Sequence, residues 1–116
     1  LLPLTPDTEN ILNLANLSQL QAGSFLINVA RGKHVVDQDL LDLLEQGQIA
    51  GATLDVFRVE PLPQDHAFWN HPKIVVTPHT SARTMREESI AQIAGKIKAV
   101  YAGQFIEGRV DKIRGY

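Results

Sequence analysis

The sequence predicts an α/β fold in which a parallel sheet of about four strands carries flanking helices and is followed by a long C-terminal helix. Two apolar runs support the sheet. Phe25–Ala30 and Ala52–Phe57 lack polar alternation, which is typical of strands covered on both faces. A helical pattern separates the two runs. The segment from residue 25 to residue 57 therefore predicts two parallel strands joined by a right-handed crossover.

Local signals define the remaining elements. Leu1–Leu4 predicts a strand before the crossover unit, and Ile74–Thr77 predicts a short strand after it. The crossover helix has Asp37 as a suitable N-cap, Gly47 as a suitable end, and leucines at helical spacing, namely Leu40, Leu41, Leu43 and Leu44. From Thr84 to about Tyr101 a longer helix is predicted, because apolar residues share one face: Ile90, Ile93, Ala94, Ile97 and Tyr101.

The composition excludes several classes of protein. Apolar residues make up 44% of the 116 residues, so we expect one domain with a real core. A net charge of −2 with interspersed signs argues against a nucleic-acid partner, and no apolar stretch has membrane-spanning length. The lack of cysteine excludes disulfides and thiolate chemistry and fits a cytoplasmic protein. Because the chain begins inside apolar sequence without an initiator Met, we expect it to be the C-terminal part of a longer protein.

Three polar residues stand where apolar runs end, and they are the best candidates for chemistry. Arg31 follows the run that ends at Ala30, Glu60 comes shortly after Phe57, and His79 follows the third run. If these runs are neighbouring parallel strands, the three side chains meet at the sheet edge where open α/β sheets bind ligands. An imidazole, a carboxylate and a guanidinium together suit the reduction of a carbonyl beside a carboxylate.

Each of the three residues also has a purely structural interpretation. The unperturbed pKa of a histidine ring is near neutrality, so His79 suits acid/base work, but taken alone it is better explained as a surface loop histidine. Glu60 could pair with that imidazole, or it could be a solvated loop carboxylate before Pro61. Arg31 could hold a substrate carboxylate, or it could close a tight turn with Gly32.

Other polar residues give weaker signals. Asp55 lies inside an apolar run, so it must be paired, either as a structural anchor near the sheet edge or as a ligand contact. Asn28 is a similar case, for which we favour a structural role. The other histidines, His34, His66 and His71, lack the spacing of a helical two-histidine zinc site, and we predict no metal site. The glycines contain no GxGxxG, the phosphate-binding loop of dinucleotide folds.

Three stretches resemble the D-isomer-specific 2-hydroxyacid dehydrogenases: LPLTPDTENIL, INVARGKHVVDQDLLDLLEQGQIAGATLDVF and EPLPQDHAFWNHPKIVVTPHTSA. The resemblance runs from residue 1 to about residue 90, and the ending is most similar to the glyoxylate- and hydroxypyruvate-reducing members. It implies half of a Rossmann-type doubly wound parallel sheet. It also implies hydride transfer between a nicotinamide cofactor and a small 2-oxo acid, with glyoxylate or hydroxypyruvate reduced to glycolate or glycerate.

The resemblance also implies roles for individual residues. It places substrate binding on Arg31, acid/base catalysis on His79 and the partner carboxylate on Glu60. The cofactor is NADP or NAD, with NADPH favoured, and the implied cofactor-binding residues are Pro3, Leu4, Thr5, Ala30, Arg31, Asp55, His79 and Ser81. Asp55 and the backbone around Ala30 would lie near the nicotinamide, and the loop at residues 3–5 near the adenosine side.

The same resemblance divides the chain. Residues 1–83 correspond to the C-terminal half of the nucleotide-binding domain, and residues 84–116 to a helix and tail that pack toward a separate substrate-binding domain. The family's glycine-rich loop belongs to an earlier part, so we expect the 116-residue chain alone to be inactive and to hold no cofactor tightly. The alternative is a non-catalytic folding unit or self-associating scaffold. We expect a homo-oligomer, or a domain-swapped dimer of the chain by itself.

Overall fold

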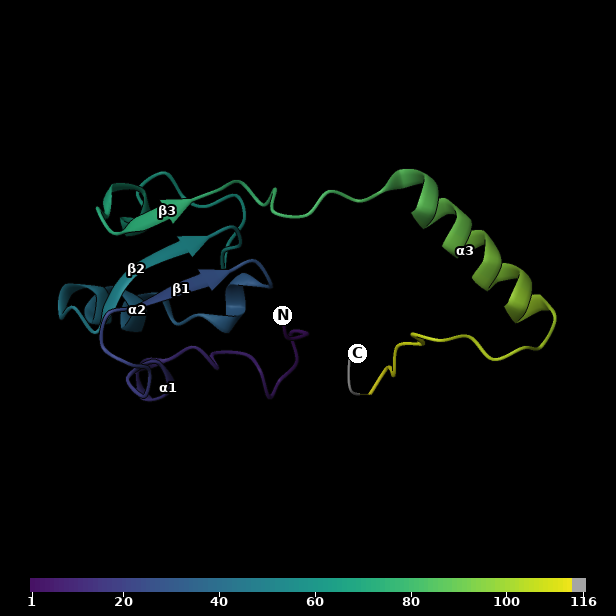
Figure 1. Cartoon of the computed structure of the whole chain (residues 1–116), viewed down its shortest axis with the longest axis horizontal. Helices are drawn as coiled ribbons and strands as arrows, with labels where there is room; N and C mark the ends of the chain where they lie inside the picture. The colour runs from purple at the N-terminus through teal and green to yellow at the C-terminus, as the bar shows by residue number, and fades with distance from the viewer. Residues whose placement is uncertain (114–116) are drawn as a thin grey trace. The chain divides into compact units, whose positions relative to one another are not determined.

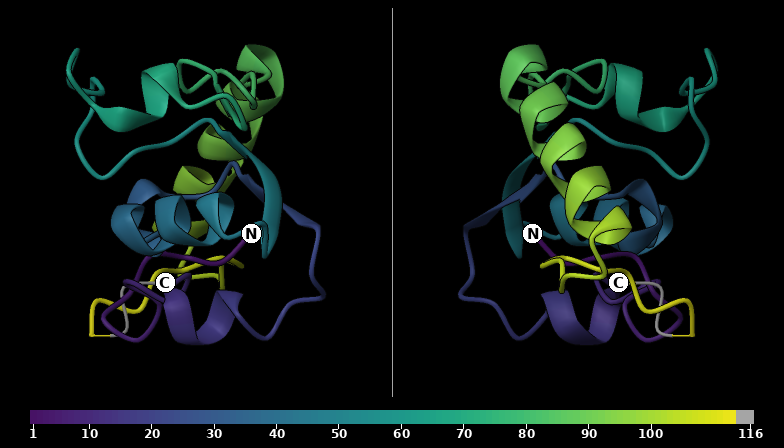
Figure 2. Two further views of the ribbon diagram at one scale, coloured as in Figure 1. Left: turned by 90° about the vertical axis from the view of Figure 1, so that its left-hand side faces the viewer. Right: turned by 90° about the vertical axis from the view of Figure 1, so that its right-hand side faces the viewer.

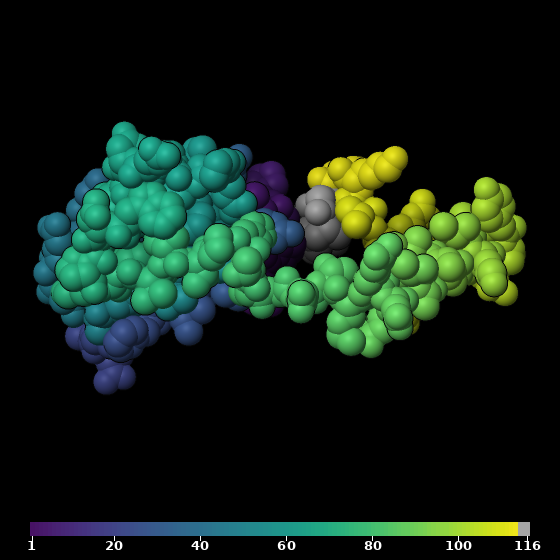
Figure 3. Space-filling model, turned by 90° about the horizontal axis from the view of Figure 1, so that it is seen from above, coloured from purple at the N-terminus to yellow at the C-terminus, as the bar shows by residue number. Residues whose placement is uncertain are grey.

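The computed structural model describes residues 1–113 and divides the chain into two compact units. Unit 1 comprises Leu1–Ser81, and unit 2 begins at Ala82. In the space-filling view, unit 1 is one continuous mass of packed atoms (Figure 3). Each unit is described by itself below.

Unit 1 contains a parallel three-stranded sheet in the order β1-β2-β3, formed by Ser24–Asn28, Ile49–Leu54 and Ile74–Val76. Asn28 pairs with Leu54, and Leu54 pairs with Val76, so the three strands end side by side. The three arrowheads in Figure 1 point to the same edge. The predicted parallel pair with an intervening helix is therefore confirmed.

The predicted strand at Leu1–Leu4 is wrong, and residues 1–113 hold three sheet strands instead of about four. Pro3 has no N–H to donate to a neighbouring strand. Its carbonyl accepts a hydrogen bond from the Thr8 hydroxyl at 2.7 Å, while the Thr5 carbonyl accepts the Thr8 and Glu9 amides at 3.1 and 2.9 Å. Local turn hydrogen bonds thus take the place of strand pairing.

The core lies between the sheet and α2 (Asp37–Glu45), and the end-on ribbon views show this helix beside the sheet (Figure 2). The short helix α1 (Leu14–Leu17) and the 3₁₀ turns η1 (Gly32–His34) and η2 (Ala67–Asn70) complete the unit. The buried hydrophobic cluster comprises Leu17, Leu26, Val35, Leu40, Leu43, Leu44, Ile49, Ala52, Leu54 and Phe68. Phe68, which lies in the connection between β2 and β3, is therefore part of the core.

The prediction that both faces are covered is wrong for the strand at Phe25–Ala30, whereas no residue of Ala52–Phe57 is exposed. Phe25 and Ile27 of β1 are 73% and 68% exposed, and Val75 of β3 is 57% exposed. Within β1, exposed and buried side chains alternate, as they must when one face alone is packed. In β1, the unbroken apolar sequence therefore corresponds to a strand with one covered face and one exposed apolar face.

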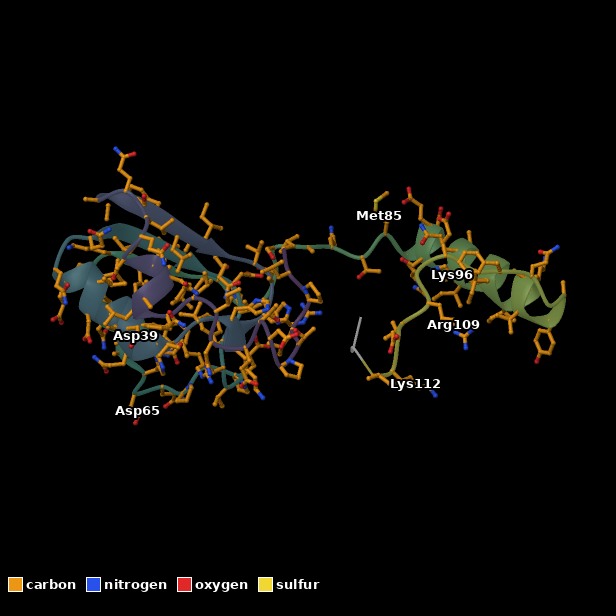
Figure 4. The ribbon with its side chains drawn as sticks, turned by 90° about the horizontal axis from the view of Figure 1, so that it is seen from below. Asp39, Asp65, Met85, Lys96, Arg109 and Lys112 are labelled. Carbon is orange, nitrogen blue, oxygen red and sulfur yellow. The ribbon has the colours of Figure 1, made fainter. Side chains whose placement is uncertain are left out.

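The start of α2 also differs from its prediction. Val36 is the N-cap, without a side-chain hydrogen bond, and Asp37 is the first helical residue. Asp39, in the first turn, accepts the Leu14 amide at 2.7 Å and so ties α2 to α1; its side chain is labelled in Figure 4. At the other end, Lys73 Nζ donates to the Leu44 carbonyl at 2.5 Å, where a cation is favoured by the helix dipole.

Unit 2 contains α3 (Arg86–Tyr101), the four residues before it and the segment that follows it. The predicted long helix is confirmed, although it begins two residues later than expected. After Gly103 the chain turns back along the helix, so that Ile106 lines a surface groove of about 660 Å³ with residues of α3. Lys96, labelled in Figure 4, places its Nζ 3.4 Å from where a Cβ on Gly108 would stand. Across residues 1–113, no helix combines the length and the apolar character required to cross a membrane.

Candidate active site

The candidate site lies where the three strands end. The loops after β1, β2 and β3 carry Arg31, Glu60 and His79, respectively. All three residues line one pocket of about 260 Å³, together with Leu4, Gly32, Lys33, Phe57 and Arg58. The structure therefore brings together the three residues that were singled out from sequence.

Glu60 and His79 are directly paired. The ring Nδ1 of His79 lies 2.9 Å from Oε2 of Glu60, and the two side chains are 54% and 39% exposed. The other oxygen of Glu60, Oε1, accepts the Phe57 amide at 3.0 Å. Both carboxylate oxygens of Glu60 are thus hydrogen-bonded. Because the His79 ring is oriented through Nδ1, Nε2 is the ring nitrogen that can contact a ligand.

The surroundings of Glu60 favour its charged form. The Phe57 N–H hydrogen bond is the largest cause that lowers the pKa of Glu60, followed by the hydrogen bond with His79. The positive charge of Arg31, which lines the same pocket, lowers this pKa to a smaller extent. At neutral pH Glu60 is therefore ionised, and a carboxylate beside imidazole stabilises the imidazolium form.

His79 sits in an unusual backbone conformation. Its φ of +53° lies in the left-handed region, which costs a residue with a Cβ roughly 1 kcal/mol or more. The loop is held from both sides of His79. Asp55 accepts the Thr77 hydroxyl, the Thr80 amide at 2.9 Å and the Ser81 amide at 2.9 Å. These hydrogen bonds explain how the strained residue keeps its position at the rim.

Asp55 is an almost completely buried carboxylate, with 1% of its surface exposed. The Thr77 hydroxyl hydrogen bond is the main reason that the pKa of Asp55 lies far below its ordinary value, and bonds from Ser81 and Thr80 add to the effect. Burial opposes this shift but is outweighed. Of the two interpretations left open by the sequence, these contacts support the structural anchor, and direct contact with a cofactor stays a prediction.

Arg31 is presented by a turn that Asn28 stabilises. Asn28 is 3% exposed; its Nδ2 donates to the Arg31 carbonyl at 3.0 Å, and its Oδ1 accepts the Ala30 amide at 3.1 Å. The structural role expected for Asn28 is therefore what the contacts show. The Arg31 guanidinium donates to the Ala30 carbonyl at 2.6 Å, and within residues 1–113 it forms no ion pair with Glu60. It remains exposed at the pocket.

Gly32 permits the loops after β1 and β2 to touch. A Cβ added at Gly32 would overlap the backbone of Phe57, so a hydrogen is the largest substituent that fits. The sequence indicated a turn at this glycine. It gave no sign of the close approach, because Phe57 is distant along the chain.

A second pocket, of about 480 Å³, shares Phe57, Glu60 and His79 with the first. Its other lining residues are mostly apolar: Pro61, Leu62, Trp69, Val76 and Pro78. The indole N–H of Trp69 donates to the Pro63 carbonyl at 2.8 Å and holds the side chain to its own loop. Half of its surface nevertheless remains exposed at this pocket.

The remaining predicted residues lie around the same end of unit 1. Leu4 lines the smaller pocket, and Thr5 is buried, with its amide bonded to the Thr8 hydroxyl at 2.8 Å. The Pro3 carbonyl lies 3.4 Å from Nε2 of His34, which is buried. No contact in residues 1–113 assigns a ligand to any of them, so their cofactor roles stay predictions.

Arg58 is the residue that sequence reasoning missed. It lies between Phe57 and Glu60, it lines the smaller pocket, and its guanidinium reaches two other segments of unit 1. An arginine in a loop carries no local signal of such contacts. Its partners are 23 and 48 residues away along the chain, so the tertiary structure was needed to reveal them.

Comparison with known proteins identifies a family and several relatives of this chain. Residues 1–81 match the family described as D-isomer specific 2-hydroxyacid dehydrogenase, NAD binding domain. Over all 116 residues the chain is 53% identical to glyoxylate/hydroxypyruvate reductase A of Serratia proteamaculans and 48% identical to that of Escherichia fergusonii. The chain spans 37% of the length of each of these relatives.

Solved structures give the same picture. The chain superposes with a TM-score of 0.94 and 41% identity on a D-isomer specific 2-hydroxyacid dehydrogenase from Xanthobacter autotrophicus in complex with NADPH and MES. It superposes with a TM-score of 0.92 and 39% identity on an NADPH-dependent glyoxylate/hydroxypyruvate reductase from Sinorhizobium meliloti in complex with NADP and sulfate. All of this chain is covered in both cases, against 48% and 38% of those chains.

Proposed function

The chain belongs to the D-isomer-specific 2-hydroxyacid dehydrogenase family, and we propose that it carries the catalytic residues of an NAD(P)H-dependent reductase of small 2-oxo acids. Glyoxylate and hydroxypyruvate are the proposed substrates, because relatives with these activities in their names cover the whole chain. The observation that carries the proposal is the Glu60–His79 hydrogen bond at a pocket that Arg31 also lines.

In the proposed reaction each residue does one task. Arg31 holds the substrate carboxylate with its planar guanidinium. His79, protonated and oriented by Glu60, donates a proton from Nε2 to the carbonyl oxygen while C2 accepts a hydride. A bound nicotinamide would supply that hydride. The Glu60 carboxylate holds the ring through Nδ1 during the transfer, and the product is the 2-hydroxy acid.

The residues of this chain fit the reacting end of such a cofactor and not its whole length. The volume of the smaller pocket, about 260 Å³, is below the roughly 300–1,000 Å³ of ordinary ligand sites. The sequence also contains no GxGxxG loop to hold a pyrophosphate. We therefore assign the nicotinamide side to Ala30, Arg31, Asp55, His79 and Ser81. The adenosine side is assigned to residues 3–5. NADPH is favoured because two similar proteins were solved with NADPH or NADP.

We further propose that α3 packs against a substrate-binding domain that is not part of this chain. Its face of exposed isoleucines supports this proposal, because such a face is stable in water only when it is covered. The 116-residue chain alone should self-associate through its exposed apolar side chains and should not oxidise NADPH. Sedimentation over a range of concentrations tests the first point, and a monomer at high concentration would contradict it.

The function is best tested in a full-length enzyme. This chain would replace the matching 37% of the Serratia proteamaculans relative, and NADPH oxidation would be followed with glyoxylate and hydroxypyruvate. In that protein, His79→Ala should lower kcat by about 10²–10⁴-fold, because the proton donor is lost.

His71→Ala is the matched control. The His71 ring accepts the Lys73 amide at 3.2 Å and lines neither pocket that contains His79, so activity should be retained. A folded, NADPH-binding full-length protein without reductase activity would favour the alternative of a non-catalytic scaffold. Near-normal turnover of His79→Ala would show that His79 is not the proton donor.

A further inference from the structure

Arg58 lies at the junction of three segments that surround the candidate active site. Its Nη1 donates to Oδ1 of Asn10 at 2.7 Å and to the Val35 carbonyl at 2.7 Å, with the Lys33 carbonyl at 3.4 Å. Its Nη2 lies 3.8 Å from a carboxylate oxygen of Glu9. The side chain is 31% exposed, so most of it is packed inside unit 1.

These contacts connect the loops that bear the proposed catalytic residues. The first loop contains Arg31 and continues through residues 32–35, where two carbonyls accept from Arg58. The second loop contains Arg58 itself, with Glu60 two residues further on. The third segment, residues 9–10, is held to the first loop by the Asn10 amide, which donates to the Lys33 carbonyl at 2.9 Å. One guanidinium thus joins three chain segments.

The chemistry of arginine suits this position. A guanidinium is planar, stays charged at neutral pH and directs several N–H groups at separated acceptors, whereas a lysine ammonium is a compact point charge on a flexible stem. Glu9 stands near the Arg58 charge, and the charge of Arg58 also acts on the carboxylate of Asp37. The residue is therefore compensated within unit 1 and is not free to bind a substrate anion, although it lines the pocket.

We propose that Arg58 is a positioning residue that sets the spacing between Arg31 and the Glu60–His79 pair. This inference rests on the proposed function. By holding the two loops together, Arg58 fixes where the substrate carboxylate sits relative to the proton on His79. A displacement of about 1 Å between an anchoring group and a reacting group can lower a rate by about 10²-fold.

The kinetic test separates positioning from simple charge attraction. In the full-length enzyme described above, Arg58→Ala should lower kcat by about 10–100-fold and change KM for glyoxylate by less than about threefold. Arg58→Lys, which keeps the charge but loses the planar donor array, should also lower kcat. If Arg58 merely attracted the anion, Arg58→Ala would raise KM with kcat unchanged and Arg58→Lys would restore KM. That result would overturn the inference.

A second readout does not depend on activity. In the 116-residue chain, amide hydrogen exchange should be faster in Arg58→Ala at Asn10 and Leu12, whose amides donate to the Lys33 and His34 carbonyls. Exchange within α2 should be unchanged. Arg109→Ala, an exposed arginine of unit 2, should leave both measurements at the level of the unsubstituted protein. If Arg58→Ala does not fold by circular dichroism, Arg58→Lys gives the same comparison.

The two experiments fail in different ways. An unsubstituted full-length protein without activity would refute the proposed function, while faster exchange in the Arg58 variants would still show that Arg58 holds the loops. An active protein whose kcat is unaffected by Arg58→Ala would refute the positioning role alone. Unchanged exchange at Asn10 and Leu12 would overturn the inference in either case.

Discussion

The two main helices of this protein have similar N-terminal turns and very different surroundings. In α2, three leucines of nine residues are buried, with Leu40 and Leu44 at 0% exposure. None of the sixteen residues of α3 is buried, and Ile93 and Ile97 are 58% and 51% exposed. Both helices carry two acidic residues in the first turn, and neither has a side-chain N-cap. The difference therefore lies in what each helix packs against.

The same contrast separates the two units. Unit 1 has a hydrophobic core, and it also holds every residue of the candidate site. Helical spacing of apolar residues predicted both helices correctly, but burial depends on a partner surface that the spacing alone does not provide. Stability and chemistry should accordingly respond to substitutions in unit 1, and substitutions in α3 should have little effect on this chain.

The largest effect is expected from truncation of a core leucine. Leu44→Ala removes buried methyl groups and leaves a cavity, which should lower the free energy of unfolding by about 2–5 kcal/mol. Ile97→Ala removes a half-exposed side chain and should change it by about 0.5 kcal/mol or less. Urea unfolding can be followed by far-ultraviolet circular dichroism, which reports on both helices, and by the fluorescence of Trp69, the single tryptophan, which reports on unit 1. Equal losses in both variants would show that α3 is as well packed as α2.

A glycine pair sharpens the comparison. Gly32→Ala introduces a Cβ into the Phe57 backbone and should destabilise unit 1 by about 1–3 kcal/mol or more. Gly95 lies within α3 with no atom near its missing Cβ, so Gly95→Ala should stabilise that helix by about 0.5–1 kcal/mol. Thermal unfolding by circular dichroism measures both changes. The assignment of a close loop contact would be wrong if Gly32→Ala were neutral.

The smallest effect concerns pH. The Phe57 amide and His79 lower the pKa of folded Glu60 below its ordinary value of 4.5. A carboxyl group with a lowered folded pKa contributes stability above its unfolded pKa, and this contribution is lost as the pH falls through the folded pKa. Glu60→Gln should thus reduce the loss of stability on acidification below about pH 4.5.

Urea unfolding monitored at Trp69 between about pH 7 and about pH 3 checks this expectation. Glu88→Gln in the first turn of α3 is the control, and its pH dependence should match that of the unsubstituted chain. A Glu60→Gln variant with the same pH dependence as the unsubstituted chain would mean that the hydrogen bonds of Glu60 do not persist in solution.

Several features were predictable because their signals are local. The parallel strands, the crossover helix and the long helix follow from runs and spacing within the segments themselves. The Leu1–Leu4 strand was wrong because a short apolar stretch cannot show whether its backbone will pair with a strand or with its own turn. The cap at Asp37 was wrong by one residue, which is a usual uncertainty at a helix end.

The candidate site likewise has some features that local sequence predicts and others that it does not. Arg31, Glu60 and His79 could be identified from sequence because each follows an apolar run, and parallel strands end at a common edge. The hydrogen bond of Glu60 to His79 joins residues 19 positions apart, and Arg58 reaches Asn10 across 48 positions. Such contacts depend on how loops from different strands approach one another, and no local pattern encodes that distance.

The order of strands and helices, and the chemical types available at the strand ends, were determined by the amino-acid sequence alone, because hydrophobic spacing and backbone preferences act over a few neighbouring residues. Tertiary structure alone decided which apolar faces are buried, that the Asp55 carboxylate holds the His79 loop, and that Arg58 joins three segments. These outcomes require surfaces that are distant in the chain to meet, since burial and hydrogen-bond pairing are properties of the contact between two segments.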